Sequence, residues 1–191
     1  QKVKIHQAAF DVHVYLLEKY NYESDIVFTR PNYCKIDFLV DVNRKDKLFF
    51  NPDELSLLEN NLKEHGIGGG IKYILNVAES LGDKYGFKLK ATTDAKYLEL
   101  GISTKTDNVD YFLDNVMAER KIKIEDCCFW GDEFTYLGEG IKGSDAFMMT
   151  ERSRFADFYD VSERPLRLPE NVKHVGGGVN GFFRFLQSQV E

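Results

Sequence analysis

The chain has 191 residues, of which 43% are hydrophobic and 14% aromatic, so it can bury the core of one domain or of a domain with a smaller lobe. Its net charge of −6 argues against a nucleic-acid partner, because non-specific nucleic-acid binding needs a concentrated basic face. No apolar run approaches the roughly 20 residues that cross a bilayer, and no signal peptide opens the chain. We therefore expect no membrane partner and a cytoplasmic location.

The cysteines and histidines show no metal-binding or disulfide pattern. Cys34, Cys127 and Cys128 form no CxxC pair, and their odd number fits no closed disulfide framework. The four histidines lack the spacing of paired metal ligands. These features predict free thiols in a reducing compartment and exclude zinc chemistry.

The first half of the chain alternates between helical and strand-like hydrophobic periodicity. Helices are expected over residues 5–20, 52–65 and roughly 71–85, the last two ended by Gly66 and Gly86. Strands are expected over residues 35–42, 87–93 and 96–102. Together, residues 1–100 predict a separate α+β lobe.

The second half, residues 101–191, carries the segments that could perform chemistry. A polar segment at 103–122 begins a helix, "DCCFWGD" reads as a strand, "SDAFMM" as a turn, and "HVGGGVNGFFRFLQSQ" as a loop that leads into a final helix. Because helices and strands alternate, we predict an α/β fold with a mostly parallel sheet.

Asp132 follows an apolar strand and a turn-forming glycine. In open α/β sheets, ligands bind outside the carboxyl ends of the strands. A carboxylate there suits a hard cation such as Mg²⁺, which is usually held by one or two carboxylates plus phosphate. Considered alone, however, Asp132 is equally well explained as a turn or helix-capping residue.

Lys105 lies directly before a predicted helix, beside Thr104. A lysine is unfavourable at a helix N-terminus, because the helix dipole there favours anions. The arrangement makes sense if the ammonium and the first amides of the helix bind one phosphate together. The alternative is a solvated surface lysine.

Considered together, the two segments resemble the haloacid-dehalogenase-like (HAD) phosphatases, especially the Cof-like branch with a large α/β cap. The resemblance is carried by "YLELGISTKTDNVDYFLDN" and "FWGDEFTYLGEGIKGSDAFMM", in which Lys105 and Asp132 are 27 positions apart. It implies that residues 1–100 correspond to much of the cap and residues 101–191 to the C-terminal half of a HAD-like (Rossmann-like) core.

The resemblance further implies hydrolysis of small phosphorylated metabolites, sugar phosphates above all, through an aspartyl-phosphate. Lys105, with Thr104 beside it, would bind the phosphoryl group and neutralise its charge, and Asp132 would bind Mg²⁺.

The chain departs from the family's Gly-Asp-x-x-Asn-Asp motif, since Thr135 and Tyr136 occupy the last two places. Ser144-Asp145 resembles a displaced copy of the motif's second half, which makes Asp145 the preferred second metal carboxylate. Glu133 is the rival candidate, because some members of the family use adjacent acids.

The family's nucleophile motif, Asp-x-Asp-x-Thr, is absent from the 191 residues. The nearest match is "FLVDVN", with Asp41 as a poor candidate, so the nucleophile is expected upstream, in a longer gene product. A non-catalytic HAD-like domain that binds a phosphorylated ligand or a protein is the alternative, and an unrelated α/β binding domain is a third interpretation. Residues 29–35 and the loop 66–71 are candidates for substrate selection.

Overall fold

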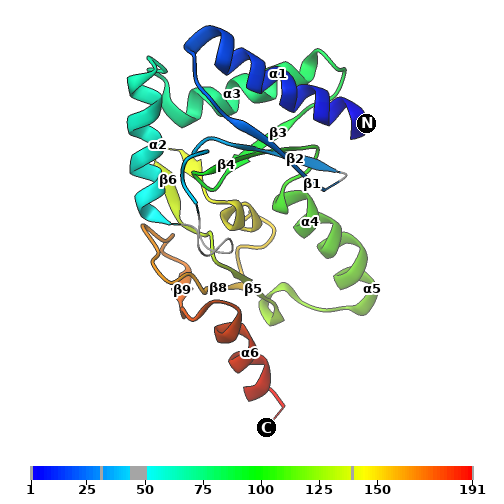
Figure 1. Cartoon of the computed structure of the whole chain (residues 1–191). Coiled ribbons are helices and arrows are strands. Elements are labelled where there is room, and N and C mark those ends of the chain that lie inside the picture. Colours follow the sequence, from blue (N-terminus) through cyan, green and yellow to red (C-terminus); the bar gives the residue numbers. More distant parts are fainter. Residues whose placement is uncertain (1, 31, 44–50, 139, 191) are drawn as a thin grey trace. The chain divides into compact units, whose positions relative to one another are not determined.

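The computed structural model describes residues 2–30, 32–43, 51–138 and 140–190. The chain divides into two compact units (Figure 1). The first unit contains the described residues up to Asn43 together with Asp53–Thr104, and the second contains Asn51, Pro52 and the described residues from Lys105 onward. We call them unit 1 and unit 2.

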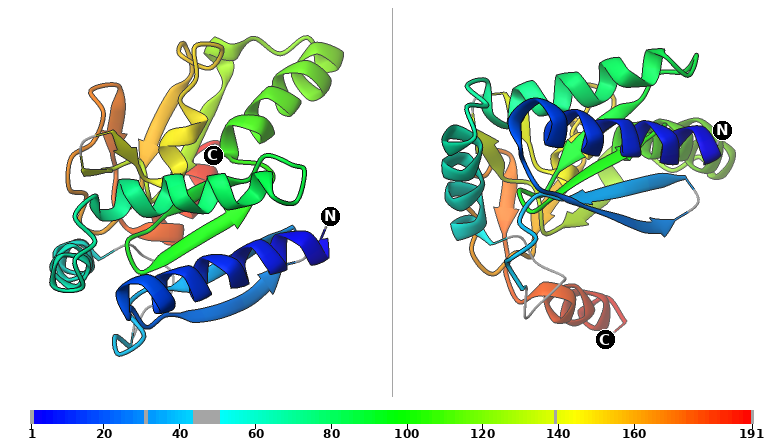
Figure 2. Two further views of the ribbon diagram at one scale, coloured as in Figure 1. Left: turned by 90° about the horizontal axis from the view of Figure 1, so that it is seen from above. Right: turned by 45° about the horizontal axis from the view of Figure 1, so that its top comes forward.

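Unit 1 is built on a four-stranded antiparallel sheet. Its strands are β1 (Asp25–Arg30), β2 (Tyr33–Asp37), β3 (Lys90–Thr93) and β4 (Tyr97–Gly101), in the order β1-β2-β4-β3. Its helices are α1 (Lys2–Tyr20), α2 (Pro52–Glu64) and α3 (Gly70–Asp83). Helices α1 and α3 lie side by side on one face of the sheet (Figure 2).

The core of unit 1 follows from the alternation of side chains along its strands. Cys34 and Ile36 of β2 and Leu98 and Leu100 of β4 are fully buried, whereas the residues between them are half-buried. Helix α1 approaches the sheet closely because it presents small residues there, and Ala8 and Ala9 are fully buried. Hydrophobic burial on one sheet face therefore holds unit 1 together.

The predicted strand over residues 35–42 is too long. Strand β2 ends at Asp37, because the Asp37 carboxylate accepts a hydrogen bond from the Leu39 amide at 2.9 Å and turns the chain. The buried Lys96 ammonium fixes the turn by donating to Asp37 (2.9 Å) and to the Leu39 carbonyl (2.5 Å). The helices predicted in this half are confirmed to within a few residues.

Unit 2 contains the parallel sheet that the alternating pattern predicted. Strands β5 (Cys128–Gly131), β8 (Asp157–Asp160) and β9 (Val172–His174) pair in the order β5-β8-β9, all parallel. A small antiparallel pair, β6 (Tyr136–Gly138) and β7 (Ile141–Lys142), follows β5. The fold class is therefore confirmed as α/β: unit 2 contains a parallel sheet, and unit 1 is an α+β unit with an antiparallel sheet.

The helices of unit 2 begin with α4 (Lys105–Tyr111), which continues through a π-helical turn, η1 (Phe112–Met117), into α5 (Ala118–Arg120). Two short 3₁₀ helices, η2 (Ile124–Asp126) and η3 (Ser144–Met148), and the final helix α6 (Gly178–Ser188) complete the unit. No helix in the described part of the chain is long and apolar enough to cross a membrane.

The two faces of the parallel sheet are covered differently. On one face, the buried Phe158 packs against Phe134, with ring centroids 5.9 Å apart. On the other face, Trp130 stacks on Tyr159 at 4.6 Å and contacts the aromatic side of α6 through Phe185 at 4.7 Å. Successive residues on a strand point to opposite faces. Gly131 and Asp160 directly follow Trp130 and Tyr159, so they face the same side as Phe158.

Candidate functional site

The candidate site lies at the carboxyl-terminal edge of the parallel sheet in unit 2. Strand β5 ends at Gly131 and is followed by Asp132. Gly131 pairs in register with Asp160 of β8, which in turn pairs with His174 of β9. The ends of all three strands thus meet at one edge, which is where α/β sheets bind their ligands.

The chain brings Asp145 back to this edge by way of the β6–β7 hairpin and η3. Asp145 is only 3% exposed. One of its carboxylate oxygens, Oδ2, accepts hydrogen bonds from the backbone amides of Asp132 and Glu133, both at 2.8 Å. A Cβ atom at Gly131 would overlap the Asp145 carboxylate, so this close approach requires glycine at position 131.

Lys105 completes the arrangement from the start of α4. Its ammonium forms an ion pair with Asp145 Oδ1 and donates a hydrogen bond to Ser144 Oγ at 3.0 Å. Burial alone would lower the pKa of Lys105, but the charges of Asp145, Glu133 and Asp132 together raise it above its ordinary value. Lys105 therefore remains a cation at neutral pH.

Asp132 is half-buried beside these groups. Its pKa is raised to about 6, first by burial and then by the negative charge of Asp145, while Lys105 acts in the opposite direction. In the part of the chain that the structure describes, only its own backbone amide hydrogen-bonds to it. A bound cation would therefore stabilise the ionised form of Asp132.

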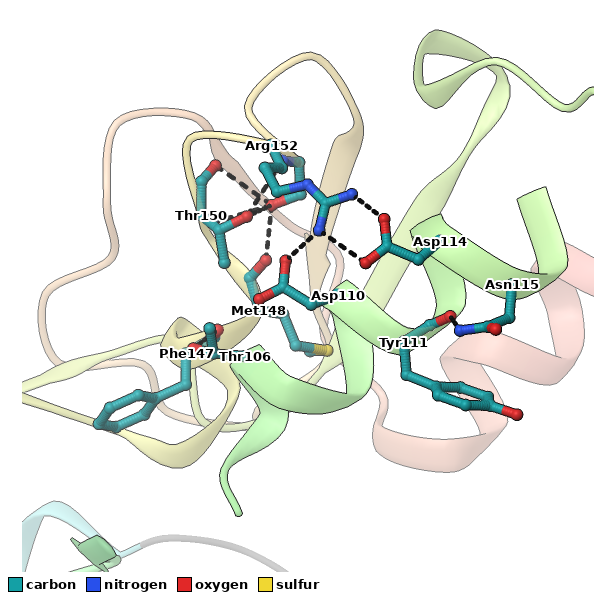
Figure 3. A network of polar contacts seen from close by, with 10 residues as sticks. Thr106, Asp110, Tyr111, Asp114, Asn115, Phe147, Met148, Thr150 and Arg152 are labelled. Atoms are coloured by element: carbon teal, nitrogen blue, oxygen red, sulfur yellow. Dashed lines mark hydrogen bonds and ion pairs between the residues drawn. The ribbon is translucent and has the colours of Figure 1, made fainter. Parts of the chain in front are cut away.

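The helical stretch that begins with Lys105 contacts both η3 and the segment that follows it (Figure 3). Thr106 Oγ1 donates to the Phe147 carbonyl at 2.6 Å. Arg152 forms ion pairs with Asp110 and Asp114 on the same helical stretch. These contacts hold the start of α4 against η3, which carries Asp145.

The donor set can be tested for its fit to Mg²⁺. Among the described residues, no group of three or more His, Cys, Asp and Glu side chains could hold a metal ion by itself. Both oxygens of Asp145 are engaged by Lys105 and backbone amides, and Glu133 accepts a 2.6 Å hydrogen bond from Ser144. Asp132 is the carboxylate that fits, since Mg²⁺ commonly takes one or two carboxylates and completes its shell with water and phosphate.

The other residues suggested by the sequence lie elsewhere. Thr104 directly precedes Lys105 and is the last residue of unit 1. Asp41 lies in an exposed turn of unit 1 rather than at the end of a parallel strand. Residues 29–35 span the connection between β1 and β2, with Pro31 outside the described residues, and the loop 66–71 leads into α3.

Two neighbouring residues at this edge, Asp160 and His174, were not singled out from the sequence. Asp160 is fully buried, and its charge contributes to the raised pKa of Asp132. The signal was present, because "DFYD" is a short strand that ends in a carboxylate, as "CCFWGD" is. Recognising β8 as a parallel strand would have placed Asp160 at the site.

Proteins similar to this chain were found among solved structures. No family model and none of the curated proteins compared with the chain match it. Among solved structures, the chain is similar to an IMP-bound mutant of Plasmodium falciparum IMP-nucleotidase, with 14% identity, coverage of 80% of this chain and a TM-score of 0.42. A second structure of that nucleotidase has 9% identity, 92% coverage and a TM-score of 0.38.

The chain spans about a third of the length of these nucleotidases, 31% of the first structure and 32% of the second. Likenesses with such low identity and TM-scores do not establish a shared activity.

The close approach of Asp145 to Gly131 can be tested by substitution. We expect Gly131→Ala to lower the free energy of unfolding by about 1–3 kcal/mol, because the added methyl group would displace a buried carboxylate. Urea denaturation followed by circular dichroism measures the change. Gly68→Ala is the control, since a Cβ there meets nothing within 4 Å. Equal losses in the two variants would contradict the packing described here.

The raised pKa of Asp132 predicts a pH-dependent stability. Because the pKa in the folded state, about 6, lies above the ordinary value of 3.8, protonation favours the fold. This contribution is fully present below the ordinary value and is lost as the pH rises through about 6. We therefore expect Asp132→Asn to gain stability relative to the wild type as the pH is raised, as measured by urea denaturation across this range.

The exposed Asp126 supplies the control for this measurement, because Asp126→Asn changes the same charge away from the site. The same pH dependence in both variants would show that Asp132 is not electrostatically strained.

Proposed function

We propose that the chain belongs to a Mg²⁺-dependent phosphohydrolase of the HAD-like superfamily, in its Cof-like branch, that acts on small phosphorylated metabolites, sugar phosphates above all. The observation that carries the proposal is the convergence of Lys105, Asp145 and Asp132 at the carboxyl end of a parallel strand. An unrelated α/β binding domain would give no reason for this convergence.

In this proposal, Lys105 contacts the transferring phosphoryl group. Its ammonium is held by Asp145 and Ser144, so it needs little reorganisation when the phosphate binds. The raised pKa of Lys105 keeps the positive charge that phosphoryl transfer requires. Thr104 is the adjacent residue that would contribute to phosphate binding.

Asp132 would hold Mg²⁺, which supplies charge compensation on the phosphoryl oxygens when it is bound. Asp145 serves mainly to orient Lys105 and the backbone after β5, because both of its oxygens already accept hydrogen bonds. Asp145 is the preferred second carboxylate of the metal site, and Glu133 is its rival.

The nucleophilic aspartate is proposed to lie upstream of these 191 residues, with residues 1–100 forming the cap. The exposed turn that carries Asp41 offers it no partner comparable to Lys105 among the contacts described for unit 1. A cytoplasmic location is part of the proposal and is supported by the thiols of Cys34, Cys127 and Cys128, which are all free.

A second candidate function is a non-catalytic HAD-like domain that binds a phosphorylated ligand or a protein. It is favoured by the departures of the sequence from the family pattern: Thr135 and Tyr136 occupy the last two places of the fourth motif, and these 191 residues contain no Asp-x-Asp-x-Thr. In that case the site would bind phosphate through Lys105, and Mg²⁺ would add nothing to binding.

The proposal predicts a loss of Mg²⁺-dependent phosphate release from an aryl phosphate in the gene product that contains this chain. We expect Lys105→Ala and Asp132→Asn each to lower kcat by about 10²-fold or more, the usual cost of removing one group that compensates transition-state charge. The exposed residues Lys142 and Asp126 supply matched controls, as Lys142→Ala and Asp126→Asn, and should leave kcat unchanged. Full activity in both Lys105→Ala and Asp132→Asn would contradict the proposal.

A further inference from the structure

A second polar cluster lies at the ends of β8 and β9. Asp160 is fully buried, and its Oδ2 accepts hydrogen bonds from Ser162 Oγ at 2.6 Å and from His174 Nδ1 at 2.7 Å. Its other oxygen, Oδ1, is buried and has no hydrogen-bond partner among the described residues. Since a buried carboxylate is costly unless hydrogen-bonded, Asp160 depends on these two donors.

This cluster fixes the orientation of the His174 imidazole. A carboxylate accepts hydrogen bonds and does not donate them, so Nδ1 must carry the hydrogen that it shares with Asp160. In the neutral ring, Nε2 is then the nitrogen with a lone pair, available to an external donor. The carboxylate is buried, but 41% of the His174 side chain is exposed. A merely structural histidine needs no such exposure.

The backbone after β9 carries a glycine beside this nitrogen. The amides of Val175 and Gly176 both donate to the Asp160 carbonyl, at 2.7 and 3.2 Å, so the loop turns away from the strand end. Gly176 has a positive φ of 68°. A Cβ there would lie 3.4 Å from His174 Nε2, so a side chain at this position would crowd the ring.

His174 belongs to the same polar row as the candidate phosphate site. Gly131, Asp160 and His174 are partners in register, so they face the same side of the sheet. The space above Gly131 is filled by the Asp145 carboxylate, which pairs with Lys105. Because neighbouring strands are about 4.8 Å apart, His174 lies about 10 Å along the row from the Gly131 position.

We propose that His174 binds a hydroxyl group of the phosphorylated ligand, with Asp160 as the residue that positions it. Lys105 would hold the phosphoryl group at one end of the row, and His174 Nε2 would accept a hydrogen bond from the polyol part at the other end. The ligand class is therefore a hydroxyl-rich phosphate monoester. This inference rests on the proposed function, because it takes the phosphate to bind at Lys105.

The test compares the binding of glucose 6-phosphate and orthophosphate to the 191-residue chain by calorimetric titration. One hydrogen bond to a hydroxyl should make glucose 6-phosphate bind roughly 3- to 10-fold more tightly than orthophosphate. In His174→Asn, the amide nitrogen takes the place of Nδ1 and can still donate to Asp160, but no atom replaces Nε2. We expect the advantage of glucose 6-phosphate to vanish in this variant while orthophosphate affinity is unchanged. Histidine NMR signals give a second readout: His174 should shift with glucose 6-phosphate and not with orthophosphate.

Two variants separate this inference from the proposed function. Lys105→Ala should weaken both ligands, whereas His65→Asn, at another exposed histidine, should weaken neither. If orthophosphate binding is absent or does not depend on Lys105, the proposed function fails. If it depends on Lys105 but glucose 6-phosphate has no advantage, or keeps its advantage in His174→Asn, the role of His174 alone is overturned.

Discussion

The ion pair between Lys105 and Asp145 is the interaction on which the organisation of unit 2 depends. Asp145 is almost fully buried, and a buried charge is tolerated only when it is paired and fully hydrogen-bonded. Lys105 satisfies one oxygen, and the backbone amides after β5 satisfy the other. Three segments distant in sequence are thereby joined: the start of α4, the end of β5, and η3. Glycine at position 131 is the steric condition for this junction.

This pairing divides the work among the carboxylates at the sheet edge. Both oxygens of Asp145 accept hydrogen bonds from the chain, so Asp145 orients Lys105 and the backbone after β5. Asp132 lies beside it with a pKa raised to about 6, and its charge is therefore the one that an added cation would stabilise. Asp160, one strand further along, uses its carboxylate to orient His174. Asp145 and Asp160 are thus buried acids that position Lys105 and His174, and Asp132 is the acid that remains available.

The sequence predicted the parts of this site that lie on strongly patterned segments. Lys105 and Asp132 could be found because each stands at a boundary between a periodic element and a turn, and Asp145 because it resembles a displaced motif. The hydrogen bonds of Asp145 to the amides after β5 could not be predicted, since they depend on the path of the β6–β7 hairpin. Asp160 was missed because "DFYD" was not recognised as a strand, so its final carboxylate was not placed at the edge of the sheet. The strand at 35–42 was overextended because an aspartate side chain, Asp37, ends it.

We propose that Asp132 is the available carboxylate of a site that takes Mg²⁺ beside a phosphate held by Lys105. The proposal can be tested by following the Asp132 carboxyl carbon by NMR through a pH titration of the 191-residue chain in orthophosphate, with and without Mg²⁺. We expect Asp132 to have a pKa of about 6 without the metal and a clearly lower pKa with it, because a bound cation favours the ionised carboxylate. A pKa that Mg²⁺ leaves unchanged would show that Asp132 does not bind the metal.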